Sequence, residues 1–328
     1  MTDLAVIIVS WNVRNLLAAC LHSLQVDLSG SKLSGEIWVV DNASSDGSVA
    51  MIRRDHPQVR LIASDKNLGF AGGNNAALRA VGFGDPENAA SKRTAANHPA
   101  AVLLLNPDTE VHPGALQTLF DFLQRTPRAG IAGAHLVYGD GSFQHSAFAM
   151  PGLWQLAIEL LPLPGRLVDS RLNGRYPQSL YERSRPFQIG HPLGAAMCVR
   201  GKAIQQVGLL DESYYMYVEE IDWSKRMNAA GWRAYCVPQA KVTHFGGQSA
   251  GQIEASSFIY LWSSRYQFYR RHYARLKVWL AALIVRAGMR RKAAQAAAAA
   301  ARGDLSRLEI DDRLGCYDQV INIWQGKI

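Results

Sequence analysis

Hydrophobic and polar positions along residues 1–140 alternate between two spacings, one typical of buried strands and one of amphipathic helices. Leu4 to Val9 is a continuous apolar run rich in β-branched residues, which predicts a strand buried on both faces. Apolar residues from Val13 to Leu24 recur every three or four positions, which predicts a helix, and Asn12 is placed to cap it. Further strands are predicted at 36–40, 59–63, 101–105 and 130–137, and helices at 48–54, 71–81 and 113–125. This alternation predicts an α/β fold with a doubly wound, mostly parallel sheet flanked by helices.

The pattern is interrupted twice before it ends in a helical tail. Residues 84–99 are polar and predict a surface loop, whereas residues 139–192 are rich in Pro, Gly and Arg. Irregular packing over the sheet and a substrate-specific cleft wall explain the second stretch equally well, because long loops often carry function. Regular spacing returns with a strand at 195–200, a helix at 218–230, strands at 234–237 and 241–243, and a long helical tail. We therefore expect a domain over 1–250 and a helical extension over 251–328.

Composition narrows the class of protein. The chain has 328 residues, of which 48% are hydrophobic, so it has enough apolar material for a buried core. Its apolar runs fall short of the roughly 20 residues that a membrane-spanning helix needs. The start of the chain lacks the basic and long apolar regions of a signal peptide, and the expected location is cytoplasmic. Four widely spaced cysteines fit free thiols in a reducing compartment.

The basic excess is concentrated in the tail. The net charge is +8, but ten Lys and Arg residues lie between Arg265 and Arg302 in a stretch without Asp or Glu. The rest of the chain has 25 basic and 27 acidic residues, a net charge of −2. A helix with solvated arginines, an anionic membrane surface as partner through 265–302, and a nucleic-acid-binding tail all fit this charge. Apolar and basic residues of 275–292 do not separate into two faces, and no nucleic-acid-binding module is recognisable, so we expect no nucleic acid partner.

Polar residues follow each of the first four predicted strands. The candidates for binding a ligand at these strand ends are Ser10, Asn12, Asp41, Asn67, Gly69, Gly72, Asn75, Asn106 and Asp108. Turns favour the same residue types, but the carboxyl ends of parallel strands meet at one edge, where nucleotides bind. Neither a G-x-G-x-x-G nor a G-x-x-x-x-G-K-[ST] pattern is present, which argues against dinucleotide-binding and P-loop sites. Asp108 either ends its strand in a turn or holds Mg²⁺ or Mn²⁺, cations that prefer oxygen ligands.

Two further candidates lie near the end of the first domain. Three acids stand at a predicted helix start, at Glu219, Glu220 and Asp222. The helix dipole stabilises acids in the first turn, but one of these carboxylates could also act as a general base. His244 follows a short strand, and a single histidine is more often structural than a ligand.

Six segments, in this order, resemble glycosyltransferase family 2. They are SWN at 10–12, VVDNASSDGS at 39–48, NLGFAGGNN at 67–75, LLLNPDTEV at 103–111, LDESYYMYVEEIDWSKRMNAAGW at 210–232 and HFGGQS at 244–249. The similarity is greatest to the rhamnosyltransferase-like branch of this family, whose members are inverting enzymes of the GT-A fold. The resemblance implies a nucleotide-binding half at about 1–110 and an acceptor-side half at about 111–250.

The resemblance also implies substrates and a location. The donor would be a nucleotide-sugar, with dTDP-rhamnose favoured over a UDP- or GDP-sugar. The acceptor would be a glycan or a polyprenyl-diphosphate-linked glycan of the cell envelope. Such an enzyme would work in the cytoplasm, either free or peripherally at the inner face of the cytoplasmic membrane. Homo-oligomer formation stays open.

Roles for single residues follow from the same resemblance. Asp41 would contact the nucleotide base together with Ser10 to Asn12, and Asn67 to Asn75 would lie near the ribose and diphosphate. Asp108 matches the last acid of the family's D-x-D motif, which binds Mg²⁺ or Mn²⁺, and Asn106 replaces its first acid. His244 matches a histidine that completes the metal's protein ligands in several relatives.

The same resemblance assigns the base. Glu220 matches the family's catalytic base, usually an Asp, with Glu219 and Asp222 as near alternatives. The set of Asp108, Glu220 and His244 argues against a non-catalytic nucleotide-sugar-binding relative.

Overall fold

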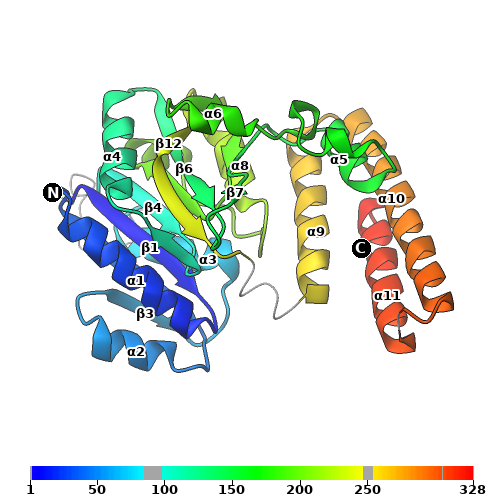
Figure 1. Ribbon diagram of the computed structural model, residues 1–328, viewed down its shortest axis with the longest axis horizontal. Coiled ribbons are helices and arrows are strands. Elements are labelled where there is room, and N and C mark those ends of the chain that lie inside the picture. The colour runs from blue at the N-terminus through cyan, green and yellow to red at the C-terminus, as the bar shows by residue number, and fades with distance from the viewer. Residues whose placement is uncertain (1, 85–97, 247–253, 305, 328) are drawn as a thin grey trace. The chain divides into compact units, whose positions relative to one another are not determined.

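The computed structural model describes residues 2–84, 98–246, 254–304 and 306–327, which belong to two compact units (Figure 1). One unit comprises 1–150, 176–215 and 219–249, and the other 151–175, 216–218 and 250–328. The stretch 139–192 is therefore divided, because its middle part belongs with the C-terminal helices. The boundary expected at residue 250, and residues 85–97 of the expected surface loop, lie outside the described residues.

The first unit is built on a mixed sheet whose strands follow the order β3-β2-β1-β4-β11-β6-β12-β5. The main strands are β1 (Leu4–Ser10), β2 (Gly35–Asn42), β3 (Arg60–Ser64), β4 (Ala101–Leu105), β5 (Thr109–Val111), β6 (Ala129–Val137), β11 (Ala196–Arg200) and β12 (Arg233–His244). The strands β1 to β4 are mutually parallel, β11 runs antiparallel to β4 and β6, and β12 is again parallel to β6. The predicted α/β fold class is confirmed.

Short strands extend this sheet at its second half. They are β7 (Phe143–Gln144) beside β6, β9 (Phe187–Ile189) beside β12, and a separate antiparallel pair of β8 (Ala147–Phe148) and β10 (His191–Pro192). The two strands predicted at 234–237 and 241–243 are one strand, β12, with a register shift between Val237 and Lys241. Pro238 lies at that shift, where the missing backbone N–H does not interrupt a regular ladder.

Helices cover both faces of the sheet and enclose two apolar cores. One core includes residues of α1 (Arg14–Ser29), α2 (Ser48–Asp55) and α4 (Ala115–Arg125). The other includes residues of α3 (Gly69–Ala80), α6 (Gln178–Glu182), α7 (Gly201–Val207) and α8 (Glu219–Ala229). Because each β-strand of the centre is buried on both sides, its sequence is apolar without alternation, as the run Leu4 to Val9 predicted.

The cap predicted for α1 is wrong. Asn12 has a left-handed backbone (φ 51°), and its Oδ1 accepts a hydrogen bond from the Ser45 N–H at 2.8 Å. The first N–H of the helix, from Arg14, donates instead to Asp46 Oδ2 at 2.7 Å. Asp46 also accepts from Ser48 at the start of α2, so one carboxylate satisfies two helix N-termini. The capping group comes from a loop distant in sequence, which local spacing could not predict.

The second unit is helical. It contains α5 (Leu153–Leu160), two 3₁₀ turns (Gly165–Leu167 and Arg171–Asn173), α9 (Glu254–His272), α10 (Arg275–Ala301) and α11 (Arg307–Trp324). Gly288 of α10 packs so tightly on α5 that a Cβ there would lie 2.5 Å from Leu160 Cβ. Arg265 of α9 pairs with Glu159 at 2.8 Å, which also attaches α5. Among the described residues, no helix combines the length and the apolar character required to cross a membrane.

A buried histidine, His191, should make the stability of the first unit depend on pH. Burial lowers the pKa of His191 from its usual 6.5 to about 4, and its Nδ1 lies 3.0 Å from Pro192 O. The folded state thus favours the neutral ring, so this contribution to stability is complete above about pH 6.5 and is lost as the pH falls towards 4. The lost stability amounts to about 3 kcal/mol. We expect the free energy of unfolding, measured with urea, to depend less on pH between 4 and 6.5 in His191→Gln than in the parent. The exposed His22→Gln variant should show the same pH dependence as the parent. Equal slopes for His191→Gln and the parent would contradict this account.

Candidate active site

The polar residues predicted at the strand ends lie at one edge of the sheet. Ser10 is aligned with Asp41 on the neighbouring strand, and the last residue of β4, Leu105, is aligned with Ile8. Asp41 Oδ2 accepts a hydrogen bond from Ser44 N–H at 2.9 Å. Its Oδ1 and the Ser10 Oγ are buried and have no partner among the described residues. Buried polar atoms are almost always hydrogen-bonded, so two unpaired atoms side by side indicate a place for a ligand.

Asp108 and His244 come together from different parts of the chain. Thr109, at the start of β5, is the register partner of His244 at the end of β12. His244 Nε2 consequently lies 3.5 Å from Asp108 Oδ1, and both side chains are buried. Gln144 Oε1 lies 3.2 Å from His244 Nδ1. We assign the proton to Nδ1, which donates to Gln144, so the lone pair of Nε2 faces Asp108.

This pair fits a divalent cation. His244 Nε2 is buried and makes no hydrogen bond within the described residues, and a carboxylate oxygen stands beside it. No cluster of three or more His, Cys, Asp or Glu suited to a metal occurs in the described ranges. The other ligands would therefore be phosphate oxygens and water, which is how Mg²⁺ and Mn²⁺ sites on nucleotides are usually completed. Asn106 lies two residues before Asp108, and its carboxamide makes no hydrogen bond in the described part of the chain.

Glu220 is brought to the same edge by a different set of contacts. A Cβ on Gly194 would lie 3.8 Å from Glu220 Cδ, so the glutamate side chain packs on this glycine. The next residue, Ala195, accepts a hydrogen bond from the Asn106 N–H at 2.9 Å. Glu220 is therefore near the position that replaces the first acid of the D-x-D motif.

A strained turn precedes these acids. Tyr217 and Val218 have φ values of 69° and 74°, in the left-handed region that β-branched residues avoid. Such strain persists only where the surrounding structure imposes it, and it occurs most often at functional sites. The sequence carries no signal for it, since neither residue is Gly or Asn.

The other two acids of α8 are in different environments. Burial, and secondly the negative charge of Glu220, raise the pKa of Glu219 well above its usual range. Glu219 Oε2 has no hydrogen-bond partner among the described residues. Asp222 is fully buried and pairs with Arg226 at 2.6 Å, while Arg226 also donates to the carbonyl of Leu209. Asp222 thus helps to fix α8 against the segment that contains Leu209, through Arg226.

The glycine-rich start of α3 is largely occupied by protein groups. Asn67 Oδ1 accepts from the Gly69 N–H at 2.9 Å, and the Phe70 N–H donates to the Tyr215 carbonyl at 3.0 Å. Gly69 has φ 71°, and a Cβ there would lie 2.2 Å from that carbonyl oxygen, so only glycine fits. Gly72 lies in the same turn. These first amides are therefore less available to a phosphate than a free helix N-terminus would be.

Asn75 lies further along α3 and is engaged elsewhere. Its carboxamide donates to the Leu210 carbonyl at 2.8 Å and to Glu212 Oε1 at 2.9 Å, and accepts from the Leu210 N–H at 3.1 Å. The Asn75 carboxamide is thus hydrogen-bonded to Leu210 and Glu212, and within the described residues it makes no hydrogen bond to Asp41 or Asp108. Sequence reasoning also missed Gln144 and Gly194, which lie beside His244 and Glu220 and belong to no motif.

Comparison with known proteins identifies the family. The family model described as Glycosyl transferase family 2 matches residues 5–208. The chain belongs to glycosyltransferase family 2. A relative 32% identical over 237 residues is N-acetylglucosaminyl-diphospho-decaprenol L-rhamnosyltransferase of Mycobacterium tuberculosis, with 71% of this chain and 73% of that protein covered. Low-salt glycan biosynthesis hexosyltransferase Agl10 of Haloferax volcanii is 29% identical over 201 residues, with 60% and 55% covered. The chain is a rhamnosyltransferase-like glycosyltransferase.

Solved structures share its GT-A fold. GalNAc-T7 with UDP, GalNAc and Mn²⁺ matches with a TM-score of 0.58 and 15% identity over 86% of this chain. The chain spans half of the length of that protein. The mannosyltransferase PcManGT of Pyrobaculum calidifontis with GDP-Man and Mn²⁺ matches with a TM-score of 0.54 and 14% identity, covering all of this chain and 89% of that one.

Proposed function

We propose that this family 2 glycosyltransferase moves a sugar, in the first place rhamnose, from a nucleotide-sugar to a hydroxyl group of a glycan or lipid-linked glycan, with inversion. The observation that carries this proposal is the set of unpaired buried atoms at one sheet edge, on Ser10, Asp41 and His244. The rhamnosyltransferase from Mycobacterium tuberculosis supports rhamnose and a lipid-diphosphate acceptor. With such an acceptor, the enzyme would work in the cytoplasm, peripherally at the inner face of the membrane.

The donor is a nucleotide-sugar held by the residues of the sheet edge. Asp41 Oδ1 accepts a hydrogen bond from the base, and Ser10 and Asn12 line the same pocket. Asn67, Gly69 and Gly72 lie towards the ribose and diphosphate, and Asn75 belongs to the same segment, with its carboxamide hydrogen-bonded to Leu210 and Glu212. We favour dTDP-rhamnose, with UDP- and GDP-sugars as alternatives.

Asp108 and His244 would hold Mg²⁺ or Mn²⁺ beside the diphosphate. The bound ion supplies electrostatic stabilisation of the leaving nucleoside diphosphate. Gln144 fixes the ring of His244 so that its Nε2 stays available, and a positioning partner of this kind is common behind metal-binding histidines. Asn106, which is neutral, lowers the negative charge of the site relative to a D-x-D motif.

Glu220 is the general base of a single displacement. Its carboxylate takes the proton of the acceptor hydroxyl while the hydroxyl oxygen forms a bond to the anomeric carbon. The bond from that carbon to the diphosphate oxygen breaks, and the nucleoside diphosphate leaves with the electron pair. No covalent enzyme intermediate is needed, and the configuration of the anomeric carbon inverts. Glu219 is the alternative base, because its raised pKa also suits proton transfer.

Thermal stabilisation by donors tests the proposal directly. With Mn²⁺ present and the ligand at about 100 times its Kd, binding should add about 2.7 kcal/mol and raise Tm by several degrees. We expect dTDP-rhamnose to give the largest rise among nucleotide-sugars, and the rise to disappear for Asp41→Ala. If nucleotide-sugars of every base left Tm unchanged, with and without Mn²⁺, the proposed function would be wrong.

A further inference from the structure

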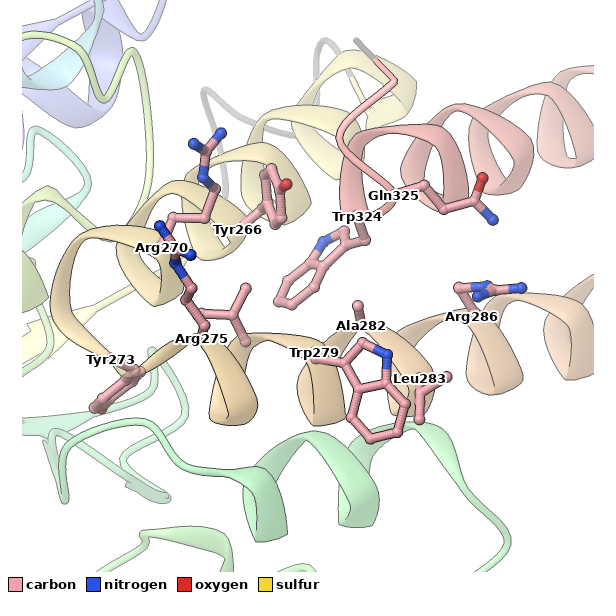
Figure 2. A pocket seen from close by; sticks show the side chains of 11 residues that line it. Tyr266, Arg270, Tyr273, Arg275, Trp279, Ala282, Leu283, Arg286, Trp324 and Gln325 are labelled. Carbon is pink, nitrogen blue, oxygen red and sulfur yellow. The ribbon is translucent and has the colours of Figure 1, made fainter.

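The second unit contains a pocket of about 480 Å³ between α9, α10 and α11 (Figure 2). One stripe of α10 forms a wall, with Arg275, Val278, Trp279, Ala282, Leu283 and Arg286 spaced as neighbours on a single helix face. The other side of α10 is buried, and it packs on α5 and α11. This explains why the basic and apolar residues of the helix do not separate into two faces: one face is core, and the pocket face carries both kinds.

The end of the pocket at the turn between α9 and α10 is strongly cationic. Arg270 lies in the last turn of α9 and Arg275 is the first residue of α10. Neither guanidinium forms an ion pair within the described residues, and residues 255–303 include no acid. The Arg270 guanidinium lies 5.7 Å from the centre of the Tyr266 ring, which leaves its N–H groups available at the edge. The uncapped N-terminus of α10 adds positive potential at the same place.

The remainder of the pocket is apolar and open. Trp279 is 57% exposed and Leu283 39% exposed, whereas Trp324 of α11 is buried and projects between the helices (Figure 2). Large apolar side chains that face solvent beside unpaired arginines are typical of surfaces that bind charged lipids. Arg286 lies about 16 Å from Arg275 along the helix axis, so one phosphate cannot contact both. A ligand that fills the pocket must therefore be an anion with an apolar extension.

We propose that this pocket binds the diphosphate headgroup of a lipid. Arg270 and Arg275 contact the phosphate oxygens, and the first part of the apolar chain lies on Trp279 and Leu283. Two arginines match a diphosphate better than the single charge of an ordinary phospholipid, because each guanidinium can bind phosphate oxygens in a bidentate manner. The proposal rests on the proposed function in one respect, that the acceptor of the enzyme is such a lipid.

Binding of the full chain to phosphatidylcholine vesicles with a small fraction of a polyprenyl diphosphate tests this assignment. The Arg270→Gln/Arg275→Gln variant should bind at least about tenfold more weakly than the parent, since two charge-assisted contacts are lost. The matched control, Arg290→Gln/Lys292→Gln, removes the same charge outside the pocket and should change affinity less than about threefold. Trp279→Ala should weaken lipid binding but not the binding of inorganic pyrophosphate. Unchanged Tm values establish that the variants are folded.

Three results would overturn the proposal. The first is an equal loss of vesicle affinity in the two double variants. The second is equal affinity of the parent for vesicles in which phosphatidylglycerol supplies the same charge. The third is binding of inorganic pyrophosphate as tight as binding of the lipid. Sugar transfer is measured separately, with a water-soluble acceptor glycan that lacks the lipid. The pocket variants should retain that transfer and lose transfer to the lipid-linked acceptor. If the parent transfers no sugar but its lipid binding depends on Arg270 and Arg275, the proposed function fails and the lipid site stands.

Discussion

Glu220→Gln is expected to lower kcat by a factor of about 100 or more while the Kd of the donor stays nearly unchanged. Glutamine keeps the size of the side chain and its packing on Gly194, but it cannot accept the proton of the acceptor hydroxyl. The measurement is sugar transfer under saturating donor, together with donor binding by calorimetry. Transfer at the parent rate would show that Glu220 is not the base.

The neighbouring acids provide the discriminating variants. Glu219→Gln mimics the protonated form that burial favours, and it should retain most of kcat if Glu220 is the base. Asp222→Asn breaks the ion pair between the buried Asp222 carboxylate and Arg226. It should therefore lower Tm, while kcat stays close to that of the parent. A loss of kcat confined to Glu219→Gln would transfer the role of base to Glu219.

Asp108→Ala is expected to weaken donor binding and metal dependence together, with kcat/KM lower by a factor of about 100 to 1,000. The buried carboxylate and His244 Nε2 are the two protein groups that face each other across 3.5 Å, and neither can replace the other. Activity is measured during Mn²⁺ titration after treatment with a chelator. Gln144→Leu should raise the Mn²⁺ concentration required by about 10- to 100-fold, because the ring of His244 loses its orienting partner.

The exposed Asp55→Ala variant is the control for charge. It removes one acid in the last turn of α2, before β3 begins, and it should leave kcat/KM and the Mn²⁺ requirement unchanged. Full activity of the parent in the presence of chelator would remove the metal from the mechanism.

Local patterns predicted most of the fold because strands and helices are marked by the spacing of apolar residues. The strands at 4–9 and 101–105 are apolar throughout, and both lie in the centre of the sheet with helices on either side. The predictions failed where a distant group decides the local structure. Asp46 displaces Asn12 from the cap of α1, and residues 151–175 pack with the C-terminal helices, a choice that no local pattern encodes.

The candidate site divides in the same way. Motif order placed Asp41, Asn106 and Asp108 at strand ends, and parallel strands bring such positions to one edge. The pairing of Asp108 with His244 needs β5 and β12 in antiparallel register, which depends on residues more than a hundred positions apart. The resemblance to a family supplied that link before the structure did, but it did not predict Gln144 behind the histidine.

By itself, the sequence determined the fold class, the family and the concentration of positive charge in the tail, because these depend on composition, spacing and motif order. The tertiary structure alone decided that Glu220 packs on Gly194, that Asp222 pairs with Arg226, and that the Asn75 carboxamide is hydrogen-bonded to Leu210 and Glu212. It also showed which two arginines of the tail, Arg270 and Arg275, line the pocket at the turn between α9 and α10. The physical reason is common to all four: each depends on which side chains are brought into contact across long sequence separations, or across the faces of packed helices.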